Sequence, residues 1–138
     1  MIRIVLDTNV LVSGMIRAFG PPSRIVDLMR EGHVELVVDD RILAEYAAVL
    51  SRPKFRAYLS AQEVRDVILF LERAMDYRVA TVHVADLPDA DDAPFLELAL
   101  TAGVPLVTGN VRHSPEACRR AADVLTPAQF LAWIIREA

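Results

Sequence analysis

The sequence IRIVL at residues 2–6 runs directly into Asp7-Thr8-Asn9. The β-branched and apolar side chains are typical of a strand that is buried on both faces, and the abrupt change to polar residues marks its end. Strands of this kind belong to parallel sheets, because helices cover both faces of such sheets. The run therefore predicts a central strand of a parallel sheet.

The rest of the chain alternates between short apolar runs and helical segments. Ser60 and Glu63 form a capping box that opens one of the predicted helices. We expect further strands at 33–38, 78–84 and 104–107, and helices at 10–17, 22–31, about 41–51, about 60–76, about 91–101 and from 126 onward. This alternation indicates an α/β fold, a single domain over residues 1–138 with a central parallel sheet flanked by helices on both faces.

The composition excludes several classes of protein. Fifteen Lys and Arg against nineteen Asp and Glu give a net charge of −4, which argues against a globally basic nucleic-acid coat. The single cysteine, Cys118, excludes an intramolecular disulfide and a thiolate metal cluster. No apolar run approaches the length of a membrane span and no signal-peptide hydrophobic region follows the N-terminus, so we expect a cytoplasmic protein.

Short polar segments follow two of the predicted strands. Asp7-Thr8-Asn9 comes after the first strand, and Thr108-Gly109-Asn110 comes after the strand at 104–107. Each segment alone could be a helix cap or a turn. Ligands in open α/β sheets bind beyond the carboxyl ends of the strands, so the two segments together favour a site at that edge.

Two further acidic features could contribute to this site. Glu45 has Ile42 three residues before it and Val49 four residues after it, which puts it on or beside the apolar stripe of its helix. The Glu45 carboxylate could reach solvent while the CH₂ groups of the side chain pack against the helix flank. An acid at this position is easier to understand if a metal ion binds it. Residues 89–92 (DADD) crowd three carboxylates together, where capping explains one or two and a hard divalent cation would use the others.

Pro94 helps to distinguish the acids of this crowded segment. Because proline is tolerated only in the first turn of a helix, the helix starts no earlier than about Asp91. Asp92 then lies in the first turn and shares a face with Phe95 and Leu96, the row that should face the sheet. Asp91 also has apolar partners, so the spacing favours Asp92 and leaves Asp91 open.

Four segments, in chain order, resemble the PIN domain family, and most closely the VapC-like ribonucleases that are the toxins of bacterial toxin–antitoxin pairs. They are residues 1–13 (MIRIVLDTNVLVS), 41–55 with Glu45-Tyr46, 89–99 (DADDAPFLELA) and 106–113 (LVTGNVRH). The resemblance covers nearly the whole chain. It implies a PIN-like fold with acids at the carboxyl edge of the sheet, and Mg²⁺- or Mn²⁺-dependent cleavage of RNA.

The resemblance also assigns roles to individual residues. Asp7, Glu45 and Asp92 match the family's acids, which are metal ligands and catalytic residues. Asn110 falls where many members have a fourth, catalytic Asp, and it brings a neutral carbonyl oxygen in place of a charge. One Mg²⁺ is therefore the default expectation. Thr108 matches the hydroxyl residue of the same motif as Asn110, and Thr8 and Asn9 match residues that steady the first acid. Asp89 is expected to support the site from the turn before the helix.

Several basic residues could contact RNA around the expected site. They are Arg52, Lys54, Arg56, Arg112 and His113. The first three alternate with proline and aromatic residues between two helices, where they could bind backbone phosphates and an aromatic ring could stack on a base. The same segment could be an exposed connector with a buried Phe55.

The resemblance implies an antitoxin protein as partner and a homodimer. A non-catalytic PIN-like module that binds RNA or protein through a degraded metal site is the alternative, and Asn110 is the feature in its favour. Receiver domains and haloacid-dehalogenase-type phosphatases both need a lysine after a late strand. They are excluded because Lys54, the only lysine, follows a helix that Pro53 terminates.

Overall fold

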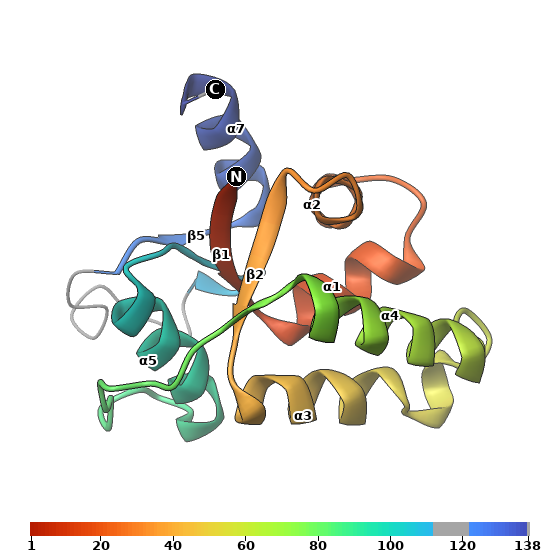
Figure 1. Ribbon diagram of the computed structural model, residues 1–138, viewed down its shortest axis with the longest axis horizontal. Helices are drawn as coiled ribbons and strands as arrows, with labels where there is room; N and C mark the ends of the chain where they lie inside the picture. Colours follow the sequence, from red (N-terminus) through yellow and green to blue (C-terminus); the bar gives the residue numbers. More distant parts are fainter. Residues whose placement is uncertain (112–121, 138) are drawn as a thin grey trace.

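The computed structural model describes residues 1–111 and 122–137. Its five parallel strands form one sheet in the order β3-β2-β1-β4-β5 (Figure 1). The strands are β1 (Ile2–Leu6), β2 (Val34–Val38), β3 (Asp76–Tyr77), β4 (Leu106–Val107) and β5 (Val124–Leu125). The helices are α1 (Thr8–Ile16), α2 (Pro21–Arg30), α3 (Asp40–Leu50), α4 (Ala61–Ala74), α5 (Ala93–Ala102) and α7 (Pro127–Glu137), with 3-10 turns η1 (Pro53–Phe55) and η2 (Ala90–Asp92).

The predicted α/β architecture is confirmed. β1 is the central strand: it pairs with β2 on one side and β4 on the other, both in parallel register. Ile4, Val5 and Leu6 are completely buried, as the apolar run at residues 2–6 predicted. This central position places the residue after β1, Asp7, in the middle of the carboxyl edge of the sheet.

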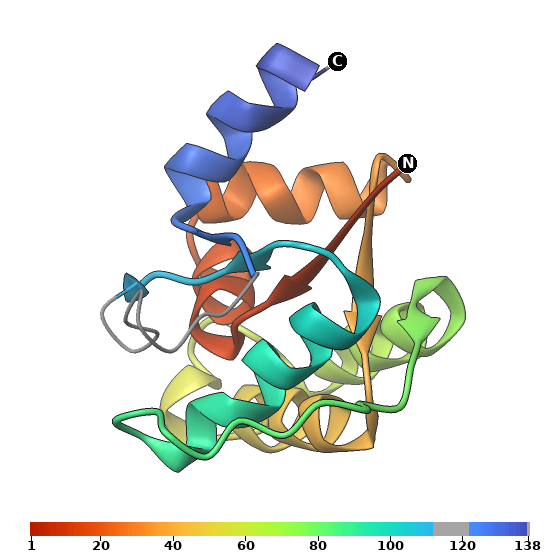
Figure 2. The same cartoon turned by 90° about the vertical axis from the view of Figure 1, so that its left-hand side faces the viewer.

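Helices cover both faces of the sheet. α5 lies on one face, while α1, α2 and α4 lie on the other (Figures 1 and 2). α3 starts at the carboxyl end of β2 and packs against α1, α4 and α5. It therefore lies beside the carboxyl edge of the sheet, where the polar segments follow the strands. α7 packs against α2 and β5 near the opposite end of the strands. In the described parts of the chain, no helix has the length and apolar character needed to cross a membrane.

The predicted helix ends rely on specific caps. Asp39 accepts a hydrogen bond from the amide of Ile42 at 2.9 Å, and Ser60 with Glu63 completes the expected capping box of α4. Gly103, with φ at +67°, ends α5 in the left-handed region that glycine adopts most easily.

The close approach of α1 to α2 depends on Gly14. A Cβ atom at this position would lie 2.5 Å from both the carbonyl oxygen of Pro22 and Cγ2 of Val26. Such separations are well inside van der Waals contact, so a side chain at position 14 would push the helices apart. Gly14 therefore sets how tightly α2 covers the sheet beside α1.

The prediction of a strand at 78–84 is wrong. β3 is only Asp76–Tyr77, after which the chain leaves the sheet and crosses to α5. There the amide of Thr81 donates to Thr101 Oγ1 at 3.0 Å and that of Val84 donates to Glu97 Oε2 at 2.8 Å. Because side chains of α5 satisfy these amides, the β-branched run needs no neighbouring strand.

The short strand β5 was not predicted. It consists of Val124 and Leu125, which pair with Leu106 and Val107 of β4. Two residues are too few to show the alternation or the apolar run that marks a strand in a sequence.

Candidate active site

Asp7 is held at the carboxyl edge of the sheet by β4. It occupies the N-cap position of α1, but its side chain makes no capping hydrogen bond, so the simple capping interpretation is wrong. Its Oδ2 atom instead accepts a hydrogen bond from Thr108 Oγ1 at 2.7 Å, and its amide donates to the carbonyl of Val107 at 2.9 Å. Thr108 is buried, with 4% of its surface exposed. Both the backbone and the carboxylate of Asp7 are therefore fixed.

Glu45 is held in a matching way from the start of α1. It is half-buried on α3, and its Oε2 atom accepts a hydrogen bond from the buried hydroxyl of Thr8. Because Thr8 follows Asp7 directly, this hydrogen bond brings Glu45 of α3 close to the residues that follow β1. We call Asp7 and Glu45, with Thr8 and Thr108, the threonine-held pair.

The acids of residues 89–92 separate into two kinds. The carboxylate of Asp89 accepts a hydrogen bond from the amide of Asp91 at 2.9 Å, so it serves the turn that opens η2. Asp91 is exposed. Asp92 is half-buried at the junction of η2 and α5, makes no capping hydrogen bond there, and has its Oδ2 atom buried. α5 packs against β1, so Asp92 lies at the start of the helix that covers the strand leading to Asp7.

Asn110 and Asn9 differ in their relation to this pair. The backbone amide of Asn110 donates to Thr108 Oγ1 at 3.2 Å, and this hydroxyl in turn donates to Asp7. Asn110 therefore lies one hydrogen bond away from the threonine-held pair, while its side chain is exposed. Asn9 is exposed in the first turn of α1.

Three of the five expected RNA-contacting residues belong to the described part of the chain, and they lie in the segment that follows α3. Arg52, Lys54 and Arg56 are exposed around η1, about two helical turns beyond Glu45 along the chain. Lys54 Nζ lies 5.0 Å from the centre of the Phe55 ring, which is itself half-buried. Arg112 and His113 lie outside the described residues.

Tyr46 is a residue near the site that the sequence analysis did not single out. It is completely buried, and its hydroxyl donates a hydrogen bond to the carbonyl of Leu6, the last residue of β1. Burial raises the pKa of Tyr46 well above its ordinary value, and the nearby carboxylates of Asp7, Glu45 and Asp39 raise it further. The hydroxyl therefore stays protonated and acts as a donor. An aromatic hydroxyl on the apolar stripe, next to a candidate ligand, was the available signal.

The donors of the threonine-held pair suit a divalent cation in kind. Carboxylate oxygens are the ligands that Mg²⁺ uses, and it usually takes one or two of them and keeps several waters. Among residues 1–111 and 122–137, no ion pair neutralises Asp7 or Glu45. In the same part of the chain, no three or more His, Cys, Asp or Glu side chains form a group that could hold a metal ion. The arrangement thus offers two carboxylates, with Asp92 as a third acid on the adjoining helix.

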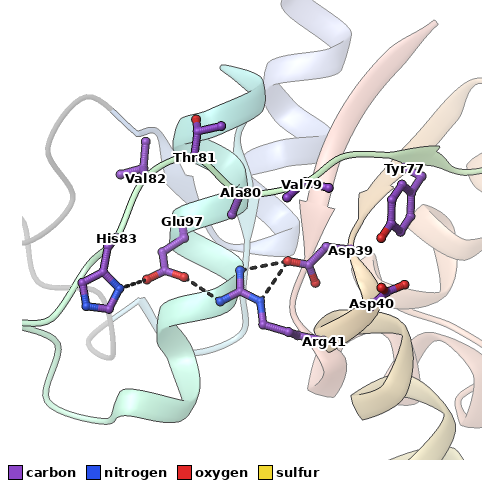
Figure 3. A pocket seen from close by; sticks show the side chains of 10 residues that line it. All are labelled: Asp39, Asp40, Arg41, Tyr77, Val79, Ala80, Thr81, Val82, His83 and Glu97. Atoms are coloured by element: carbon purple, nitrogen blue, oxygen red, sulfur yellow. Dashed lines mark hydrogen bonds and ion pairs between the residues drawn. The ribbon is translucent and has the colours of Figure 1, made fainter.

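A second acidic group lies at the start of α3, around a cavity of about 470 Å³ (Figure 3). Arg41 donates to Glu97 Oε1 at 2.7 Å and to Asp39 Oδ2 at 2.8 and 3.0 Å. His83 Nδ1 lies 3.1 Å from Glu97 Oε2. We call these residues the arginine-held cluster.

The acids of the arginine-held cluster are buried, and hydrogen bonds offset the cost of burying their charge. Glu97 has 3% of its surface exposed and Asp39 has 5%. Burial by itself would raise the pKa of Glu97, but the hydrogen bonds from the Val84 amide and from Arg41 outweigh it and lower that pKa below its ordinary value. The cluster therefore ties α3, α5 and the segment before η2 together.

Comparisons with known proteins agree with the fold. A family model described as PIN domain matches residues 3–112. The chain is 28% identical over 110 residues to a Methanocaldococcus jannaschii protein named "Uncharacterized protein MJ1680", a match that covers 79% of this chain and 71% of that protein. The fold of this chain is also similar to one in the crystal structure of VapBC2 from Rickettsia felis bound to a DNA fragment from their promoter. That similarity has a TM-score of 0.58 at 14% identity and covers 91% of this chain and 98% of the other.

Proposed function

The chain belongs to the PIN domain family, and from this we propose that it is a metal-dependent endoribonuclease that acts as the toxin of a toxin–antitoxin pair. The observation that carries the proposal is the threonine-held pair. Its two carboxylates lie at the carboxyl edge of a parallel sheet, where such folds bind ligands. They are oriented by neutral hydroxyls, so their charge is available to a cation.

The proposed cofactor is one Mg²⁺ or Mn²⁺ ion. Asp7, Glu45 and Asp92 would hold it, since a set of three carboxylates carries the charge and the hard oxygen donors that such an ion requires. The bound ion would supply stabilisation of charge on the phosphoryl oxygens and would make a water molecule more acidic. Asn110 would add a neutral oxygen or position the substrate.

The side chains of this chain have distinct parts in the proposed hydrolysis. Thr108 donates a hydrogen bond to Asp7 and Thr8 donates one to Glu45, so each carboxylate is held in one orientation. A water oxygen attacks the phosphorus while one ester oxygen leaves. Asp92 or Glu45 would orient that water and accept its proton, which is general base catalysis by a positioned carboxylate.

Cleavage of labelled RNA tests the proposal. Purified protein should hydrolyse RNA when Mg²⁺ or Mn²⁺ is added and should be inactive in excess chelator. Glu45→Gln, prepared identically, controls for a contaminating nuclease and should be inactive under all conditions. A folded protein that binds RNA without cleaving it in either metal would support the alternative, a non-catalytic module with a degraded site.

We also propose that an antitoxin covers an apolar groove of the toxin. A groove of about 290 Å³ lies between α1, α2 and α4, with Leu11, Met15 and Phe70 among its lining residues and Arg30, Glu63 and Asp66 at its charged positions. An amphipathic helix with apolar anchors would fit such a surface. Expression of this chain alone should arrest bacterial growth, and co-expression of the protein encoded beside it should restore growth. Harmless expression of metal-active protein would contradict the toxin assignment.

A further inference from the structure

The peptide group that joins β1 to Asp7 is held from two sides. Its amide, on Asp7, donates to the carbonyl of Val107 in β4 at 2.9 Å. Its carbonyl, on Leu6, accepts a hydrogen bond from the hydroxyl of Tyr46 in α3. The backbone from which the Asp7 carboxylate extends is therefore fixed by the neighbouring strand and by the helix that carries Glu45.

The position of Leu6 explains why a side chain is needed for the second contact. The register between β1 and β2 runs from Ile2–Val34 to Ile4–Leu36, so Leu6 lies beyond those paired residues. Leu6 is completely buried, and a buried carbonyl that no donor satisfies costs about 1–3 kcal/mol. The Tyr46 hydroxyl donates to this carbonyl, past the last of those pairs with β2.

A purely apolar side chain would fill the space around Tyr46 equally well. Tyr46 is completely buried, packed within the same core as Leu6 and Ile42. A tyrosine hydroxyl that is moved out of water needs a partner, so phenylalanine is the less costly choice wherever packing alone matters. The hydroxyl at this position therefore indicates a polar task, and its acceptor is the carbonyl next to Asp7.

We infer that Tyr46 is a positioning residue for the proposed ribonuclease: its hydroxyl fixes the Leu6–Asp7 peptide relative to α3 and so sets the separation of the Asp7 and Glu45 carboxylates. The inference rests on the proposed function for its consequence in catalysis. Groups that orient metal ligands from behind commonly change metal affinity or activity by about 10-fold to 100-fold when they are removed.

The variant Tyr46→Phe removes the hydroxyl alone. Tyr77→Phe removes the same group from a tyrosine that is 44% exposed and lines the cavity beside the arginine-held cluster. Three quantities are measured for both variants and for the unchanged chain. They are the Mn²⁺ dissociation constant by calorimetry, kcat and KM for labelled RNA, and amide hydrogen exchange at Asp7 without metal. Tyr46→Phe should weaken Mn²⁺ binding and lower kcat by about tenfold or more, with KM within twofold, and should speed exchange at Asp7. Tyr77→Phe should match the unchanged chain.

The readouts separate this inference from the proposed function. If the unchanged chain cleaves no RNA, the proposed function fails, and Mn²⁺ affinity together with exchange at Asp7 still decides the role of Tyr46. Unchanged affinity, kcat and exchange in folded Tyr46→Phe would overturn the inference. If Tyr46→Phe is unfolded in buffer, the measurements are repeated in trimethylamine N-oxide, which favours the folded state. A chain that stays unfolded there assigns the hydroxyl to folding and also overturns the inference.

Discussion

Two acidic groups involve α3 and its N-cap residue, and they are held in different ways. In the arginine-held cluster, a guanidinium and a backbone amide donate to the buried carboxylates of Asp39 and Glu97. In the threonine-held pair, Asp7 and Glu45 receive hydrogen bonds from neutral hydroxyls. The first arrangement pairs its acids with a cation, and the second orients its acids through neutral donors alone.

In the function that we propose, the arginine-held cluster is structural and the threonine-held pair binds the cation. A buried acid that is paired with a cation is stabilising only while both partners are present, so its role is to connect elements of the fold. Acids that are oriented without a cation repel one another and become stable when a cation arrives. Substitutions in the two clusters should therefore have opposite effects on stability and on activity.

The largest expected effect is that of Asp7→Asn on activity. Loss of one ligand removes several kcal/mol of transition-state stabilisation, which lowers the rate of RNA cleavage by roughly 100-fold or more. The amide oxygen of Asn can still accept from Thr108, so the melting temperature in chelator should be unchanged or higher. Mn²⁺ should raise the melting temperature of the unchanged chain, because it binds the native state, and should raise that of Asp7→Asn much less. An active Asp7→Asn, or full activity in chelator, would contradict the assignment.

Asp92→Ala should also abolish cleavage, and it sharpens the comparison within residues 89–92. Asp92 is half-buried at the start of α5, whereas Asp91 is exposed. Removal of Asp92 should weaken Mn²⁺ binding and leave the apo stability nearly unchanged or slightly raised. Both properties are measured by calorimetry and thermal unfolding.

The matched controls are the other two acids of the same segment. Asp89→Ala removes the acceptor of the Asp91 amide and should cost about 0.5–2 kcal/mol of stability, as the loss of a cap does. Asp91→Ala should have a small effect, and both variants should keep most of the activity. Loss of cleavage in Asp91→Ala together with an active Asp92→Ala would reverse the assignment.

The sequence predicted the centre of the fold better than its edges. The buried strand at 2–6 and the capping box at Ser60 have strong local signals, and both are present in the structure. The segment 78–84 has the composition of a strand, but Thr101 and Glu97, far along the chain, satisfy its amides. Contacts of this kind cannot be inferred from local pattern.

The same limit applies to the site. Asp7 and Glu45 could be chosen from spacing and resemblance, and the structure brings them together through Thr8. Tyr46 stands next to Glu45 in the sequence, but a fully buried tyrosine and a core phenylalanine have the same periodicity. Only the hydrogen bond to Leu6 shows that the Tyr46 hydroxyl has a task. The role of Arg41 could likewise not be predicted, because its partner Glu97 is distant in the sequence.

Glu97→Gln tests the arginine-held cluster and should have an intermediate effect. It removes the charge that faces Arg41 and keeps the shape of the side chain. Because Arg41 is 46% exposed and can be solvated, the expected loss of unfolding free energy is about 1.5–3 kcal/mol, the range for a hydrogen bond to a charged group. Mn²⁺ affinity and cleavage by the folded variant should be largely retained. A variant of normal stability would show that the cluster does not connect the helices.

The pH dependence of stability should identify Glu97 as the titrating group. Its pKa in the folded protein lies below the ordinary value of 4.5, so its stabilisation is present above about pH 4.5 and is lost as the pH falls through the folded pKa. The difference in unfolding free energy between the unchanged chain and Glu97→Gln should therefore shrink in acid. Both chains should still lose stability there, since Arg78 and Arg3 lower the pKa of Asp76 in each. A difference that stays constant down to pH 3 would contradict this account.

The smallest expected effect is that of Asn110→Asp, which makes the threonine-held pair more negative. The amide of residue 110 already donates to the Thr108 hydroxyl that holds Asp7, so a carboxylate here would add charge close to the proposed ion. Because the side chain is exposed, the gain should be about 1 kcal/mol or less, which is up to about fivefold in Mn²⁺ affinity, with cleavage retained.

Asn110→Gly is the control: it keeps the backbone hydrogen bond and removes the side-chain amide oxygen. If Asn110 contributes an oxygen to the ion or the substrate, Asn110→Gly should lower activity while Asn110→Asp tightens metal binding. Unchanged activity and affinity in both variants would place the Asn110 side chain outside the site and would leave Asp7, Glu45 and Asp92 as its complete set of proposed ligands.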